Sequence, residues 1–281
     1  MTNHKVWLEV ALNGAAGQAF QPGIPVEPAD IIEQAVACAD AGASIVHLHV
    51  YADGQPVEDA DLYTRVFEGI REQVDVILYP TLALAGSLEE RYAPLITLAD
   101  RDLLEWGVID PGSVNITHIS QLGAGQDGIL YANPDAHIRA GLELAAERRM
   151  RPAFAIYEPG FARLGAAMAA QYPDMPTPMY RIMFSDNLLF GMPPSLEGLD
   201  FYVKHLNRVA PGAPWMLSGL DANVEELVVP ALEQGGHLRV GLEDAPFGSS
   251  ATNLELVEQA VATIQKAGFE LADVATIRAA Q

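Results

Sequence analysis

The stretch Ala-Ser-Ile-Val-His-Leu-His-Val (43–50) is an apolar run that closes with two histidines. Its length and its β-branched residues predict a buried β-strand. Side chains two residues apart on a strand point the same way, so His47 and His49 leave one face together and can share one metal ion. Such a pair can equally face solvent or hydrogen-bond buried carbonyls. The metal interpretation therefore needs a third ligand, which catalytic sites often take from a carboxylate.

Apolar runs of this kind recur along the chain, and most are followed by a stretch with helical periodicity. We predict eight strands, at residues 6–12, 44–50, 76–81, 103–109, 153–158, 180–184, 215–220 and 238–243. We predict helices at residues 29–41, 61–73, 88–98, 135–148, 196–209, 224–234 and 254–267. Strands buried on both faces that alternate with helices indicate a parallel sheet. Eight repeats indicate an α/β protein closed into a (β/α)8 TIM barrel.

The alternative to a barrel is a doubly wound open sheet, which usually carries a glycine-rich turn after its first strand. Here that turn reads Leu-Asn-Gly-Ala-Ala-Gly-Gln (12–18), without the spacing of a dinucleotide-binding fingerprint. The length of 281 residues suits one barrel, and glycine and proline are spread along the chain rather than clustered in a linker. We therefore expect a single barrel domain over residues 1–281.

The charge balance restricts the partners of the protein. With 37 acidic and 16 basic residues, the formal net charge is −21, which disfavours binding to nucleic acid and to anionic membranes. No apolar run reaches the length of a signal peptide core or of a membrane span. The single Cys38 has no internal disulfide partner and is expected to be a small buried hydrophobe. We expect a soluble, cytoplasmic protein.

A second group of polar residues follows the last predicted strand, at Glu243 and Asp244. In a closed barrel strand eight neighbours strand one, and strand two is next along, so Glu243 can reach a metal on His47 and His49. A set of two histidines and a glutamate with an open position is an established zinc site. Imidazole and carboxylate ligands also admit manganese, nickel or iron.

Arg239 lies four residues before Glu243 on the same predicted strand, so both side chains share one orientation. A guanidinium fixed there is suited to clamp a substrate carboxylate, and Asp244 beside it would stay ionised and act as a general base. Each residue also has an ordinary explanation, because Arg239 can be a structural ion-pair partner and an acidic pair at a strand end is often a solvated loop. Their joint placement at matching strand ends favours a catalytic site.

Other strand ends carry weaker candidates. Thr81 ends strand three and offers a hydroxyl to an anion, although a β-branched residue needs no function there. Ser113 and Asn115 lie in a stretch (110–115) with the composition of a turn, and they can line a pocket or cap that turn. The loop at residues 248–253 resembles a phosphate-binding barrel loop, but helix capping by Thr252 or Asn253 is the simpler interpretation.

Several blocks of the chain together resemble one family, the β-keto acid cleavage enzymes, which include 3-keto-5-aminohexanoate cleavage enzyme. The matching blocks are Ala-Leu-Asn-Gly-Ala (11–15), Ala-Gly-Ala-Ser-Ile-Val-His-Leu-His (41–49), Gly-Ser-Val-Asn (112–115), Tyr-Glu-Pro-Gly (157–160) and Gly-Gly-His-Leu-Arg-Val-Gly-Leu-Glu-Asp (235–244). The resemblance implies a metal-dependent barrel that converts a β-keto acid and acetyl-CoA into acetoacetate and a new acyl-CoA. It also implies a homo-oligomer such as a tetramer.

By the same resemblance, the zinc ligands are His47, His49 and Glu243, while Arg239 and Asp244 are the pair that generates the carbanion. Thr81 stands where the family has a serine near the substrate carboxylate.

The chain departs from the family pattern at four positions. Ala16 and Ala155 stand where members that act on an amino-substituted keto acid carry acidic side chains, so a substrate ammonium would lose its counter-charges. We therefore expect a substrate with a neutral, apolar or anionic side chain. Tyr51 replaces an arginine that is frequent in the family, and Ala245 replaces an asparagine.

Three other functions remain open at this point. A metal-dependent aldolase or lyase would use the same metal, carboxylate clamp and base. A metal-dependent hydrolase is less favoured, because such barrels place further histidines on strands five and six, which have none here. A non-catalytic metal-binding barrel would not need a base beside its metal.

Overall fold

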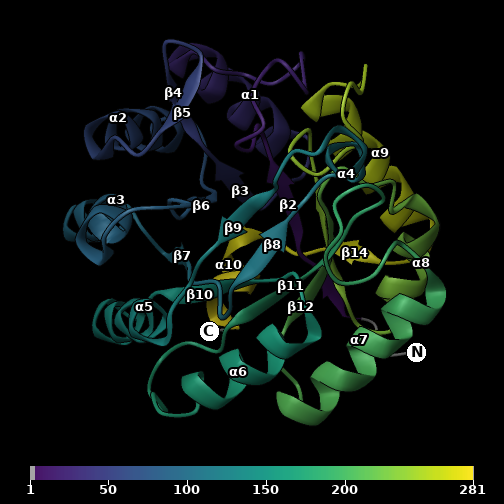
Figure 1. Cartoon of the computed structure of the whole chain (residues 1–281). Helices are drawn as coiled ribbons and strands as arrows, with labels where there is room; N and C mark the ends of the chain where they lie inside the picture. Colours follow the sequence, from purple (N-terminus) through teal and green to yellow (C-terminus); the bar gives the residue numbers. More distant parts are fainter. Residues whose placement is uncertain (1–3, 281) are drawn as a thin grey trace.

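The structure is a computed structural model that describes residues 4–280, and it is built around a barrel of parallel strands (Figure 1). The order around the barrel is β6-β3-β2-β13-β12-β11-β10-β7. The strands are β2 (Leu8–Ala11), β3 (Ile45–Leu48), β6 (Ile77–Pro80), β7 (Trp106–Val108), β10 (Arg151–Ile156), β11 (Met179–Phe184), β12 (Trp215–Gly219) and β13 (His237–Val240). Each falls within or overlaps a strand expected from the sequence, so the predicted (β/α)8 barrel is confirmed.

The first and last barrel strands along the chain pair with each other, as a closed barrel requires. β13 pairs with β2, with Arg239 opposite Glu9, and β2 pairs with β3, with Ala11 opposite His47. β6 and β7 lie side by side without a continuous ladder, so the barrel is nearly closed. The predicted adjacency of strands eight, one and two is therefore confirmed, and it brings the carboxyl ends of β2, β3 and β13 together.

Helices α1–α3 and α5–α9 form the outer ring (Figure 1). The helices are α1 (Pro28–Asp40), α2 (Ala60–Arg71), α3 (Leu88–Asp100), α4 (Ile119–Ala124), α5 (Asp135–Arg148), α6 (Pro159–Ala169), α7 (Leu196–Val209), α8 (Glu225–Glu233), α9 (Asn253–Lys266) and α10 (Val274–Ala279). Cys38 is fully buried in α1, and Thr252 caps α9, both as expected.

Helix α6 was not predicted from the sequence, because Gly160 and Gly165 lower its helical propensity. Packing against the barrel explains why the helix forms. Phe161 and Ala162 are buried, and a Cβ added to Gly165 would lie 2.8 Å from Pro111 and 2.9 Å from Phe154. The glycine that weakens the local signal is therefore what lets α6 approach the sheet.

Three small two-stranded sheets complete the fold. They are β1 (Lys5–Val6) with β14 (Glu270–Leu271), β4 (Val50–Ala52) with β5 (Gln55–Val57), and β8 (Val114–Ile116) with β9 (Ile129–Tyr131). The β8–β9 hairpin follows β7 and crosses the mouth of the barrel (Figure 1). The turn expected at residues 110–115 ends earlier than predicted, because Val114 and Asn115 pair with Tyr131 and Leu130.

We predict that Gly241→Ala destabilises the fold. Gly241 follows β13 with φ +132°, and a Cβ there would lie 2.1 Å from the carbonyl oxygen of Ala11. Backbone strain and steric overlap together should lower the free energy of unfolding by at least about 2 kcal/mol. Urea denaturation measures this loss. The control is Gly160→Ala, where no atom lies within 4 Å of the added Cβ. Equal stability of the two variants would contradict the prediction.

Candidate active site

His47 and His49 lie at the carboxyl end of β3, and both side chains are buried. Asn13, in the loop after β2, fixes the backbone of His49 from two sides. Its side-chain oxygen accepts from the His49 N–H at 2.9 Å, and its amide donates to the His49 carbonyl at 3.0 Å. Asn13 was not predicted as a site residue, although it is a polar residue after a buried strand and lies in the 11–15 block of the family resemblance.

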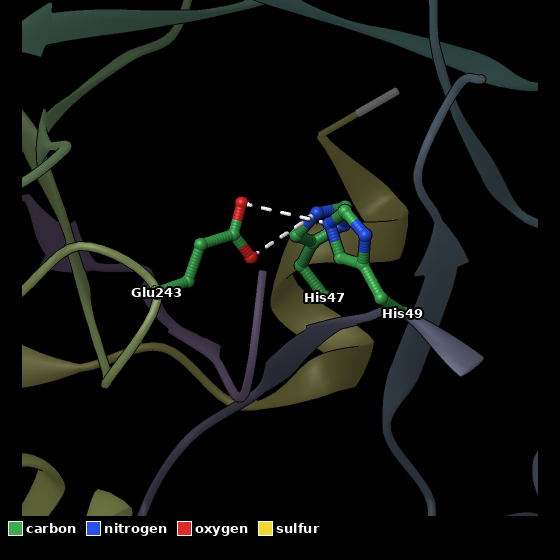
Figure 2. A group of neighbouring side chains, drawn as sticks. All are labelled: His47, His49 and Glu243. Carbon is green, nitrogen blue, oxygen red and sulfur yellow. Dashed lines mark ion pairs between the residues drawn. The ribbon is translucent and has the colours of Figure 1, made fainter. Parts of the chain in front are cut away.

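Glu243 completes the group from the loop after β13. Its carboxylate points at both imidazole rings (Figure 2), with Oε2 3.4 Å from His47 Nε2 and Oε1 3.7 Å from His49 Nε2. The strand was expected to run to Glu243 but ends at Val240, so Glu243 reaches inward through a turn and not by strand alternation. Gly14 leaves the room for it, since a Cβ there would lie 2.6 Å from Glu243 Cγ.

The protonation states suit a divalent cation. Burial lowers the pKa of His47 to about 3, so the imidazole is neutral and keeps a free lone pair. Burial alone would raise the pKa of Glu243, but Arg239 and the two imidazoles outweigh it and hold the pKa well below its usual range. One ligand atom from each of the three residues lies within 4.8 Å of the others.

Two of these ligand atoms are buried without a hydrogen-bond partner. Among residues 4–280, neither His49 Nε2 nor Glu243 Oε2 has one. Buried polar atoms are rarely left unpaired in a folded protein. Two such atoms facing a common point fit a cation as the missing partner, and two histidines with a carboxylate form a catalytic donor set.

Arg239 contacts three carboxylates at the site. Its Nε and Nη2 donate to Asp244 at 2.7–3.0 Å, its Nη2 also lies 3.0 Å from Glu243 Oε1, and its Nη1 donates to Glu9 at 3.2 Å. The guanidinium is 1% exposed, so all three nitrogens are used within the protein. This geometry differs from the expectation that Arg239 would clamp a substrate carboxylate. Glu9 was not predicted, and its signal was a lone acid inside an apolar strand.

Asp244 lies beside this cluster and is buried. Besides the bonds from Arg239, its Oδ2 accepts from the Gly219 N–H at 3.1 Å. Burial raises the pKa of Asp244 to about 6, against the opposing effect of Arg239. The carboxylate is therefore more basic than an exposed aspartate.

The weaker candidates lie around the mouth of the barrel. Thr81 follows β6 and is half-buried. Ser113 and Asn115 are exposed, and the Ser113 hydroxyl accepts from the Asn133 N–H at 2.8 Å, which is a loop-stabilising bond. Within residues 4–280, no hydrogen bond or ion pair joins these three side chains to His47, His49 or Glu243.

The sequence model of the beta-keto acid cleavage enzyme family matches residues 5–280. The chain belongs to this family. The resemblance noted from the sequence is thus confirmed for nearly the whole chain, and this family member carries the two histidines and the glutamate at one end of its barrel.

The individual relatives of this chain are named for different substrates. The chain is 30% identical to 3-oxoadipate:acetyl-CoA acetyltransferase of Cupriavidus necator, over 97% of its own length and 93% of the relative's. It is 28% identical to 3-keto-5-aminohexanoate cleavage enzyme of Fusobacterium nucleatum, over 95% and 94%. ObcA, solved as a ternary complex with a C4-CoA adduct and oxalate, shares the fold with a TM-score of 0.73 at 16% identity, covering 92% of this chain and 67% of its own.

We predict that His49→Ala abolishes binding of Zn²⁺ at one ion per chain. The substitution removes one of three ligands and leaves too few to hold the ion. Calorimetry with Zn²⁺ alone measures this, without any substrate. The control is His205→Ala, since His205 lies on α7 and bonds the carbonyl of Pro159 at 3.0 Å. Full retention of Zn²⁺ by His49→Ala would place the metal elsewhere.

Proposed function

We propose that the protein is an acyl-transferring enzyme that acts on a β-keto acid and acetyl-CoA and releases acetoacetate and a new acyl-CoA. Membership of the beta-keto acid cleavage enzyme family supports the reaction, and the name of the Cupriavidus relative supports acetyl-CoA as co-substrate. The observation that carries the proposal is that Arg239 joins Asp244 to Glu243 of the His47, His49 and Glu243 set at the carboxyl end of the barrel.

We further propose that His47, His49 and Glu243 hold a divalent metal, with Zn²⁺ first and manganese, nickel or iron as alternatives. When bound, the metal supplies a Lewis acid that polarises a carbonyl group. The balance of charges around Arg239 supports a bound dication. Glu9, Glu243 and Asp244 surround the single charge of Arg239, so three carboxylates and one guanidinium leave two negative charges buried together. Low-dielectric surroundings disfavour such an excess unless a cation balances it.

In this proposal Asp244 is the general base and Arg239 positions it. Asp244 takes a proton from the carbon between the keto and carboxylate groups of the substrate. That carbon then forms a bond to the thioester carbonyl carbon of acetyl-CoA, and the CoA thiolate leaves. The thiolate next attacks the original keto carbon, the carbon–carbon bond breaks, and Asp244 returns the proton to the acetoacetate carbanion. Buried Asp244 suits both transfers, because a carboxyl group whose pKa is about 6 is close enough to neutral pH to take up the proton and to return it.

Substrate selection is proposed from the residues around the mouth. We assign the Thr81 hydroxyl to the substrate carboxylate, and Ser113 and Asn115 to the wall of the pocket. Ala155 is buried on β10 and Ala16 lies in the loop after β2, so neither provides a counter-charge for an ammonium group. This supports a β-keto acid with a neutral, apolar or anionic side chain.

We also propose that residues 1–281 form one domain and that the protein is a cytoplasmic homo-oligomer. No helix among residues 4–280 has the length and apolar character needed to cross a bilayer. Cys38 is buried and unpaired, which suits a reducing compartment. Apolar side chains are exposed on α4, β9 and the loop after β11, at Ile119, Leu122, Ile129, Leu130 and Leu189. Such a cluster supports association between copies.

We predict turnover with acetyl-CoA. Zn²⁺-loaded protein incubated with acetyl-CoA and a panel of β-keto acids should yield acetoacetate and the matching acyl-CoA, as measured by mass spectrometry. Keto acids with a neutral side chain should react faster than the amino-substituted one. Cleavage of a keto acid without acetyl-CoA would instead identify an aldolase or lyase. Failure of every keto acid, with bound metal confirmed, would refute the proposed function.

We predict that Asp244→Asn retains Zn²⁺ but loses activity. The amide keeps the shape of the side chain and cannot accept the substrate proton, so kcat should fall at least about a hundredfold. Steady-state kinetics measure the loss, and calorimetry checks that one Zn²⁺ still binds per chain. A variant that keeps wild-type kcat would show that another group is the base.

A further inference from the structure

Glu9 is a carboxylate buried deep inside the barrel. It lies on β2, next to Arg239 on β13 in the strand register, and its side chain has no exposed surface. Arg239 Nη1 donates to Glu9 Oε1 at 3.2 Å, and the Tyr79 hydroxyl donates to the same oxygen. Behind Tyr79, Arg181 Nη1 donates to the Tyr79 oxygen at 3.3 Å. Glu9 therefore lies in a charged layer directly beneath the metal set.

Stability does not explain this layer. The interior of a (β/α)8 barrel is usually filled with branched apolar side chains. Buried ion pairs often contribute less to stability than apolar residues of the same volume, because the charges lose their hydration. Glu9 Oε2 even lacks a hydrogen-bond partner among residues 4–280, which adds to that cost. A costly carboxylate retained at this place indicates a role in the site above it.

That role follows from the position of Arg239. The guanidinium faces Glu9 on one side and the Asp244 and Glu243 carboxylates on the other. Without Glu9, its full charge would act on Glu243 and weaken the attraction of that carboxylate for a cation. Arg239 Nη1 would also lose its hydrogen-bond acceptor. The guanidinium, and with it the Asp244 carboxylate that it binds, would then be less fixed in orientation.

We propose that Glu9 is a positioning residue of the active site. It holds Arg239 from below and offsets its charge, so that Glu243 remains a strong metal ligand and Asp244 keeps its orientation. The proposal rests on the metal set proposed above, and its kinetic part also rests on the proposed reaction; metal binding can be measured without substrate, so the two parts can fail separately.

The test is Glu9→Gln, which keeps the shape of the side chain and removes its charge. We expect the Kd for Zn²⁺ alone, measured by calorimetry, to rise about tenfold, as for other residues that support metal ligands through a neighbour. We expect kcat to fall about tenfold while KM for acetyl-CoA stays unchanged. The matched control is Glu105→Gln, which removes a carboxylate paired with Arg71 and Arg278 just before β7, at the other end of the barrel. It should leave the Kd and kcat unchanged.

The outcomes are distinct. A Glu9→Gln variant that only loses thermal stability, with wild-type Kd and kcat, would overturn the proposal. If that variant does not fold, Glu9→Asp is the second test, because its shorter side chain keeps the negative charge but places it farther from Arg239. It should weaken Zn²⁺ binding and lower kcat by about threefold, and wild-type values would overturn the proposal. If no keto acid reacts while Glu9→Gln still weakens Zn²⁺ binding, the proposed function fails and the role of Glu9 stands.

Discussion

The guanidinium of Arg239 is the interaction on which the site depends. It contacts Glu9 on β2, and Glu243 and Asp244 in the loop after β13, so a single side chain joins the first and last strands of the barrel to that loop. Removing one member of a buried charge cluster typically costs about 3–5 kcal/mol, because the remaining charge is left without a partner. The positions of the three carboxylates are thus set together and not one by one.

This arrangement is possible because the backbone makes room for it. Gly241 passes over the carbonyl of Ala11 at a distance that no Cβ allows, and Gly14 leaves space for the Glu243 side chain. The chain can therefore turn inward immediately after β13. Strand alternation alone would have spread these side chains along the strand, whereas the turn brings both Glu243 and Asp244 to the same Nη2 of Arg239.

Much of this was predictable from the sequence, and the reasons for the failures are physical. The barrel, and the meeting of His47 and Glu243, follow from strand periodicity and from the rule that parallel strands present their carboxyl ends at one face. The β8–β9 hairpin was missed because each of its strands has only three residues, too few to carry a periodic signal. Glu9 was missed because its partner Arg239 lies 230 residues away, and only the closed register places them together.

The opposite wall of the barrel contains a separate group of buried polar side chains around Asp110. Asp110, after β7, accepts from the Ala155 N–H and from the Tyr131 hydroxyl, and it lies 3.6 Å from Arg181. Both carboxylate oxygens are therefore used, and the two charges offset each other. The carboxyl end of β13 is thus held by one guanidinium among three carboxylates and the far wall by one ion pair, and Arg181 links the two regions through its bond to Tyr79.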